Sequence, residues 1–160
     1  MGVRNSEEFG INLLKLADRL ISNQVLCKLL KSTSIDPLLG PDLKKKDVLH
    51  KNIKIVPLVK EEENTIENVV VIIYDSANVN EENTEFDKVY LSVLLYSPLD
   101  SWIINNDNLR PFLIISELEK SLKGKSIDGI GKLKYHGWKI EMVSDLICCF
   151  RLRFSFDSFN

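Results

Sequence analysis

Hydrophobic and polar residues alternate most regularly near the end of the chain. Apolar side chains occupy every second position from Leu146 to Phe156, and Arg151 and Arg153 stand between them. Successive side chains of a strand point to opposite faces of a sheet, so this spacing predicts a strand with one buried face. The predicted buried set is Leu146, Cys148, Phe150, Leu152, Phe154 and Phe156.

Several earlier segments also have the pattern of strands. Val69–Tyr74 is apolar throughout, which suits a buried central strand. Ile53–Val59 contains a proline, which favours a position at the edge of a sheet. A further strand is predicted over Asp87–Tyr96, with Val89, Leu91, Val93 and Leu95 on one face, and a hairpin over Lys132–Met142 with its turn near Gly137.

Helical spacing of apolar residues marks two other regions. The opening segment Ser6–Lys31 predicts either one long helix or two short ones separated near Asn23. Arg110–Lys123 predicts an amphipathic helix with Pro111 in its first turn, where the missing N–H is harmless. The buried stripe of that helix is expected to be Ile114, Ile115, Leu118 and Leu122.

Two connections stand out between these elements. Ser76–Glu85 is polar and rich in asparagine, which predicts an exposed, mobile loop. Ser97–Leu109 is long for a link between a strand and a helix, and it carries three consecutive large apolar residues, Trp102, Ile103 and Ile104. Two interpretations stay open for these three: they contact a neighbouring subunit or partner, or they fold back onto their own sheet.

The order of these elements predicts an α+β fold. An N-terminal helix or helix pair is followed by a mixed or antiparallel β-sheet that packs against one amphipathic helix. A chain of 160 residues is long enough for one domain with a substantial core. We therefore predict a single domain over residues 1–160, with a helical N-terminal segment at 1–35 and an α+β core at 52–160.

Charge and cysteine content narrow the class of protein. The formal net charge of −2 gives no overall field that attracts nucleic acid or an anionic membrane, and no apolar stretch approaches the length of a membrane span. The three cysteines are an odd number, and Cys148 and Cys149 are adjacent. We expect no disulfide framework, a reducing cytoplasm, and a packed Cys148 beside a more exposed Cys149.

Residues that carry chemistry do not form a recognisable site. Gly124-Lys125-Ser126 lacks the earlier glycine of a phosphate-binding loop, and the triplet follows a helix. His50 and His136 have no cysteine or carboxylate at ligand spacing. We therefore expect no catalytic, cofactor-binding or metal-binding residues and no enzyme activity.

Arg151 and Arg153 are the charged residues of most interest, because the alternation of the last strand places both on one face. They are either solvated strand residues or part of a face that meets another subunit or lines a charged channel. The candidate interface residues are therefore Trp102, Ile103, Ile104, Arg151 and Arg153.

Three stretches give the chain a family resemblance. They are SPLDSWIINNDNLRPFLIISELEKSLKGKSIDGIGKL, then LKYHGW, then the final strand LRFSFDSF. They resemble neck proteins of low-GC tailed bacteriophages, and the tail terminator and tail-completion group most of all. The similarity extends over residues 52–160 and the helical opening QVLCKLL…DPL.

The resemblance implies a ring of identical subunits, commonly a hexamer, that caps the tail tube and joins the tail to the head. The implied location is the virion neck, with the host cytoplasm during assembly. Its implied partners are further copies of itself and other neck and tail-tube proteins; DNA is met only as it passes through the channel, and no membrane is involved. The alternatives are a head-side connector, a baseplate component or a cytoplasmic adaptor, and then a small enzyme or nucleotide-binding protein.

Overall fold

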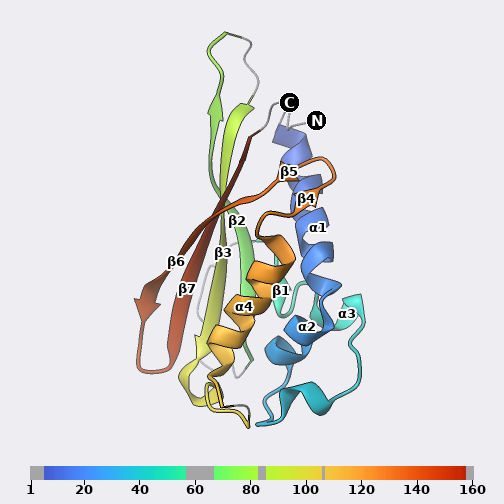
Figure 1. Ribbon diagram of the computed structural model, residues 1–160, viewed down its shortest axis with the longest axis vertical. Helices are drawn as coiled ribbons and strands as arrows, with labels where there is room; N and C mark the ends of the chain where they lie inside the picture. Colours follow the sequence, from blue (N-terminus) through green and yellow to red (C-terminus); the bar gives the residue numbers. More distant parts are fainter. Residues whose placement is uncertain (1–5, 57–66, 83–85, 106, 158–160) are drawn as a thin grey trace.

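The computed structural model describes residues 6–56, 67–82, 86–105 and 107–157. It confirms the predicted α+β class: N-terminal helices precede a mixed sheet, and an amphipathic helix packs against that sheet (Figure 1). The elements are α1 (Ser6–Ile21), α2 (Gln24–Lys31), η1 (Pro37–Leu39), α3 (Lys45–Val48), β1 (Ile53–Lys54), β2 (Val69–Val79), β3 (Phe86–Pro98), η2 (Leu99–Ser101), α4 (Arg110–Leu122), β4 (Ser126–Ile127), β5 (Gly131–Lys132), β6 (Lys134–Val143) and β7 (Ile147–Asp157).

The opening segment forms a helix pair, one of the two predicted arrangements, and Asn23 explains why. Asn23 has an extended backbone, and its side-chain oxygen accepts a hydrogen bond from the N–H of Leu26 at 3.0 Å. This cap begins α2 in a new direction. The amide nitrogen of Asn23 also donates to Glu117 at 2.9 Å and to Ser121 at 3.1 Å, which ties the junction of the two helices to α4.

The main sheet has the strand order β1-β2-β3-β7-β6 in the described part of the chain. β1 runs parallel to β2, and the other neighbours are antiparallel. The register pairs Val93 with Leu152 and Leu95 with Phe150, so the apolar faces of β3 and β7 coincide. The apolar faces of β3 and β7 both pack against the buried stripe of α4, as the matching spacings predicted. The shared core includes Val89, Leu91, Val93, Leu95, Ile114, Ile115, Leu118, Leu122, Cys148, Phe150, Leu152, Phe154 and Phe156.

Leu146 does not belong to this core, although the alternation placed it there. Its side chain is 64% exposed. The strand begins one residue later, and Leu146 lies in a tight turn in which the Ser144 hydroxyl accepts hydrogen bonds from the N–H groups of Leu146 and Ile147. The turn takes Leu146 out of the strand geometry on which period-two alternation depends.

The hairpin predicted over Lys132–Met142 is wrong, because Lys134–Val143 form one strand, β6. Gly137 has a φ of +88°, but it lies at a register shift between Tyr135 and Trp138, where the strand bulges and continues. Glycine supplies a positive φ to a bulge as readily as to a turn. The connection that reverses the chain lies at 144–146, between β6 and β7.

The loop predicted over Ser76–Glu85 begins too early. Ser76–Val79 continue β2 after a register shift at Tyr74, and they pair with the first residues of β3. Glu81 and Glu82 form an exposed turn, and residues 83–85 lie outside the described residues. Of the predicted strand Ile53–Val59, Ile53–Lys54 form the edge strand β1, while its end at 57–59 lies outside the described residues.

Candidate functional site

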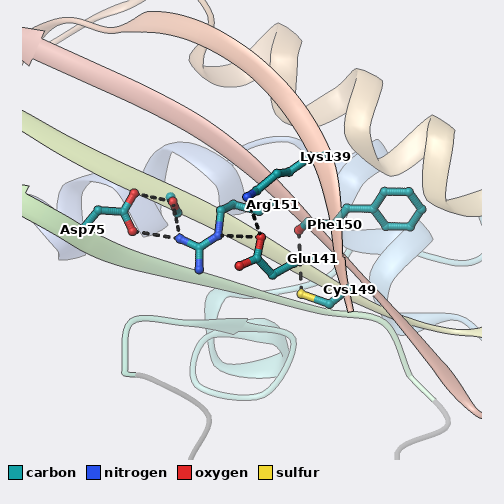
Figure 2. A network of polar contacts seen from close by, with 7 residues as sticks. Asp75, Lys139, Glu141, Cys149, Phe150 and Arg151 are labelled. Atoms are coloured by element: carbon teal, nitrogen blue, oxygen red, sulfur yellow. Dashed lines mark hydrogen bonds and ion pairs between the residues drawn. The ribbon is translucent and has the colours of Figure 1, made fainter. Parts of the chain in front are cut away.

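Arg151 and Arg153 lie on one face of β7, as the alternation predicted. That face points away from the helices; we call it the outer face, and it includes Asp75, Tyr90, Ser92, Arg151 and Arg153. Its strands are held together by a polar network centred on Arg151 (Figure 2). Arg151 Nη1 lies 2.9 Å from Asp75 Oδ1 and donates to the Ser92 hydroxyl oxygen at 2.9 Å.

The network continues from Arg151 to the edge strand β6. Arg151 Nε lies 3.4 Å from Glu141 Oε2, a contact of opposite charges without hydrogen-bond geometry, and Lys139 Nζ lies 3.3 Å from the same oxygen. The hydrogen bond from Lys139 and the charge of Arg151 lower the pKa of the Glu141 carboxyl. The positive charges of Arg151 and Lys139 thus balance the negative charges of Asp75 and Glu141 in a network that spans four strands. Arg151 is therefore occupied within its own chain, as a tie between β2, β3, β6 and β7.

A groove of about 570 Å³ lies beside this network on the outer face. Its lining includes Tyr90, His136 and Arg153, and Asp75 closes it on the side of the network. The Arg153 side chain is exposed, and it makes no ion pair with the described residues. Of the two predicted arginines, the structure leaves Arg153 available to a partner.

The three apolar residues of the 97–109 connection are separated by the structure. The Trp102 ring lies 6.0 Å from the Phe150 ring and 6.2 Å from the Phe112 ring, and Ile104 is buried in the core. Ile103 points outward with 77% of its side chain exposed. A backbone bridge between Ile103 and Leu109 closes the loop around it. Trp102 and Ile104 thus fold back onto their own domain, and Ile103 remains as a surface residue.

We expect Trp102→Ala to lower the free energy of unfolding of the monomer by about 2–3 kcal/mol, because it removes an aromatic contact with Phe150 and Phe112. Urea unfolding at a concentration below assembly measures this directly. The matched change Ile103→Ala removes an exposed side chain and should alter stability by less than about 0.5 kcal/mol. Unchanged stability of the Trp102 variant together with weaker assembly would instead favour the interface interpretation for Trp102.

Arg110 organises this region, and the sequence patterns did not reveal it. Its side chain is only 1% exposed. Nε donates to the carbonyl of Ser101 at 2.7 Å, Nη1 to those of Leu29 at 3.0 Å and Ser32 at 2.8 Å, and Nη2 to that of Ser34 at 2.5 Å. Burial lowers the pKa of the guanidinium. These four hydrogen bonds, which we call the Arg110 fork, fix the segment after α2 to the loop before α4.

These two segments form one end of the molecule, at the bottom of Figure 1. The N–H of Asn105 donates to the carbonyl of Ile35 at 2.7 Å, so the loops are also joined at their surface. Large aliphatic side chains from both loops face solvent, with Leu39 85% exposed. We call this surface the apolar end; it consists of Ile35, Leu38, Leu39, Ile103 and Leu109.

The cysteines differ from expectation at one position. Cys149 is as buried as Cys148, because it packs with Val69, Val71 and Leu94 in a second apolar cluster. Burial raises the pKa of the Cys149 thiol to about 11. Among the described residues, no group of three or more His, Cys, Asp or Glu is placed to hold a metal ion. No helix in the described ranges has the length and hydrophobicity needed to cross a membrane.

Comparison with known protein families identifies a match over most of the chain. The family model described as YomW matches residues 23–156, which extend from the cap of α2 almost to the end of β7. No curated protein matches the chain. The match includes the elements that form the outer face, the Arg110 fork and the apolar end.

Proposed function

Because the chain belongs to the YomW family, which is phage-derived, we propose that it is a structural protein of the phage virion. In this proposal it forms a ring in the neck, as a tail terminator or head–tail joining protein. The ring is a hexamer of this chain, and its partners are other neck and tail-tube proteins. The role is one of binding and assembly, and it requires neither a catalytic group nor a cofactor.

The apolar end is the observation that carries this proposal. A surface of large aliphatic side chains exposed at one end of a molecule is typical of a protein contact site. Two loops hold it, and Arg110 fixes both of them, so the surface is organised before any partner binds. An end-on contact of this kind suits a ring that stacks on the next component of the neck.

The outer face suits the channel side of such a ring. In the described residues its cations are largely paired with carboxylates of the same face: Lys134 with Asp157, Lys139 with Glu141, and Arg151 with Asp75. Arg153 is exposed beside the groove, and Lys88 lies over the Tyr90 ring. A face with little unpaired positive charge lets DNA pass without tight binding, since each phosphate contact by a free cation adds affinity.

The change Ile103→Asp tests the role of the apolar end. We expect the purified variant to keep the native mass and the melting temperature of the wild type, because Ile103 is exposed. Phage that carry the variant should accumulate heads and tails that are not joined, as counted by electron microscopy. The matched control is Val79→Asp, which places the same charge on an exposed aliphatic residue at the end of β2 and should leave joining intact.

The composition of the particles decides the proposed location. Mass spectrometry of purified wild-type particles should detect the chain at a few copies per virion. Its absence from particles, or normal joining in the Ile103→Asp phage, would contradict the proposed function.

A further inference from the structure

The side of the molecule formed by α4 and β6 carries a second exposed apolar surface. The sheet extends beyond the helices here, at the left of Figure 1, so residues of β6 that share the core-facing side of the sheet are open to solvent. Ile140 is 51% exposed, and Trp138 and Val143 are similarly open. Phe112 of α4 joins this surface, because its ring lies 6.0 Å from that of Trp138.

The same side becomes basic toward the C-terminal end of α4. A hollow of about 390 Å³ there is lined by Lys120, Lys123 and Lys125, with Glu119 among them. Glu119 accepts a hydrogen bond from the Tyr135 hydroxyl of β6 at 3.0 Å, and Lys123 Nζ lies 5.8 Å from the centre of the Tyr135 ring. These contacts place the hollow on the side of α4 that faces β6. We call the combined surface, apolar at one end and basic at the other, the β6 side.

Helix α1 presents a stripe of complementary character on the opposite side of the molecule, at the right of Figure 1. Glu7, Ile11, Leu14 and Asp18 follow the spacing i, i+4, i+7, i+11, which aligns them along one line of a helix, and all four are exposed. Ile11 is 57% exposed. The stripe has an acidic first turn followed by two large aliphatic residues, and Asp18 at its far end forms an ion pair with Lys45 of the same chain at 2.6 Å.

The two surfaces match in length and in order. At about 1.5 Å per residue, Glu7 lies about 10 Å from Leu14 along α1, and Lys120 lies about 12 Å from Phe112 along α4. The acidic first turn of α1 therefore meets the basic hollow, in which Lys120 also pairs with Glu117 at 2.6 Å, when the aliphatic residues of α1 meet Phe112 and Trp138. Direct pairing of the β6 edge with another strand is disfavoured, because β6 has register shifts after Tyr135 and Ile140. A partner is therefore expected to contact the β6 side through its side chains and not through strand pairing.

We propose that α1 of one copy docks on the β6 side of the next copy. Because the two surfaces differ and lie on opposite sides of the chain, the contact is heterologous and joins copies head to tail, as a closed ring requires. The inference rests on the proposed ring and identifies the surfaces that build it. The partner that binds the β6 side is a second copy of this chain, because charge and apolar residues match between the two surfaces.

Two variants of the full chain test this contact by mixing. Ile140→Asp should prevent docking at the β6 side, and Ile11→Asp should prevent docking through the α1 stripe. Each variant alone should therefore be monomeric by native mass spectrometry. Mixed in equal amounts, they should form a heterodimer and nothing larger, because the intact β6 side of one variant meets the intact α1 of the other. The control Val79→Asp should assemble like the wild type.

Three outcomes would overturn the inference: rings that persist in either variant, a mixture that stays monomeric, or a wild type that never self-associates. The last of these leaves the virion location to be decided separately by particle composition and by Ile103→Asp. Cross-linking provides a second measurement that does not depend on introducing a charge. Chains with Leu14→Cys and chains with Ile140→Cys should form a disulfide-linked dimer when mixed under mild oxidation, since the three native cysteines are buried. Cross-linking of either variant with itself alone would contradict the head-to-tail contact.

Discussion

Replacing Arg110 with methionine is expected to lower the free energy of unfolding by about 3–5 kcal/mol, because several carbonyls are left without a donor. Methionine fills much of the volume of the side chain but donates no hydrogen bond. The carbonyls of Leu29 and Ser101 then lose their donor in a buried site, and the carbonyls of Ser32 and Ser34 lose theirs in a partly buried one. Urea unfolding followed by circular dichroism measures the change. Arg110→Lys should recover only part of it, because an ammonium group cannot reproduce the planar fork.

Arg153→Met is the matched control, since it makes the same chemical change at an exposed arginine of the outer face. It should alter stability by less than about 0.5 kcal/mol. A loss below about 1 kcal/mol in Arg110→Met would show that the fork does not hold the two loops. The apolar end would then lack the support that the proposed function assigns to it.

The sequence predicts the elements that alternate or repeat around a core. Each apolar position of β3 named from the pattern is buried, and so is the stripe of α4, because burial against a partner element imposes a period on a segment. Asn23 gave a signal of its own, as a residue that caps helices. These features are local, so the residues that encode them are close together in the chain.

The predictions that the structure corrects lie in segments where this hydrophobic period is absent or ambiguous. Ser76 and Asn78 are polar yet belong to β2, because pairing with β3 satisfies the hydrogen bonds of their backbone without burial of their side chains. Gly137 supplied a turn signal that a bulge also fits. Cys149 is buried in a second apolar cluster on the face of β7 that also carries Arg151, so alternation did not distinguish the two environments.

The candidate site was only partly predictable, for a reason that Arg110 illustrates. Its partners are backbone carbonyls, which every residue has, and three of them lie about eighty positions away in the sequence. No side-chain pattern records such a contact, and arginine is ordinarily exposed. The run Trp102–Ile104 marked an apolar loop correctly, but its division into inward and outward side chains depends on that distant fork and on the bridge to Leu109.

We expect the substitution Phe150→Ala to lower the free energy of unfolding by about 3–5 kcal/mol. Phe150 is fully buried, and its ring lies 5.6 Å from that of Trp138, 5.9 Å from that of Phe112 and 6.0 Å from that of Trp102. Three aromatic partners from β6, α4 and the 97–109 connection cannot all collapse into the space that the ring leaves. The cavity cost therefore adds to the lost transfer free energy. Thermal and urea unfolding of the monomer measure the effect.

Leu146→Ala is the control for this prediction, because the alternation of the last strand places Leu146 and Phe150 on the same face. The tight turn at Ser144 exposes Leu146, so its truncation should change stability by less than about 0.5 kcal/mol. A loss below about 1 kcal/mol at Phe150, or an equal loss at both positions, would reject the packing of β7 against α4. Because Trp102, Phe112 and Trp138 all contact Phe150, the same cavity should also loosen the β6 side and weaken the assembly of copies at concentrations where the monomer is still folded.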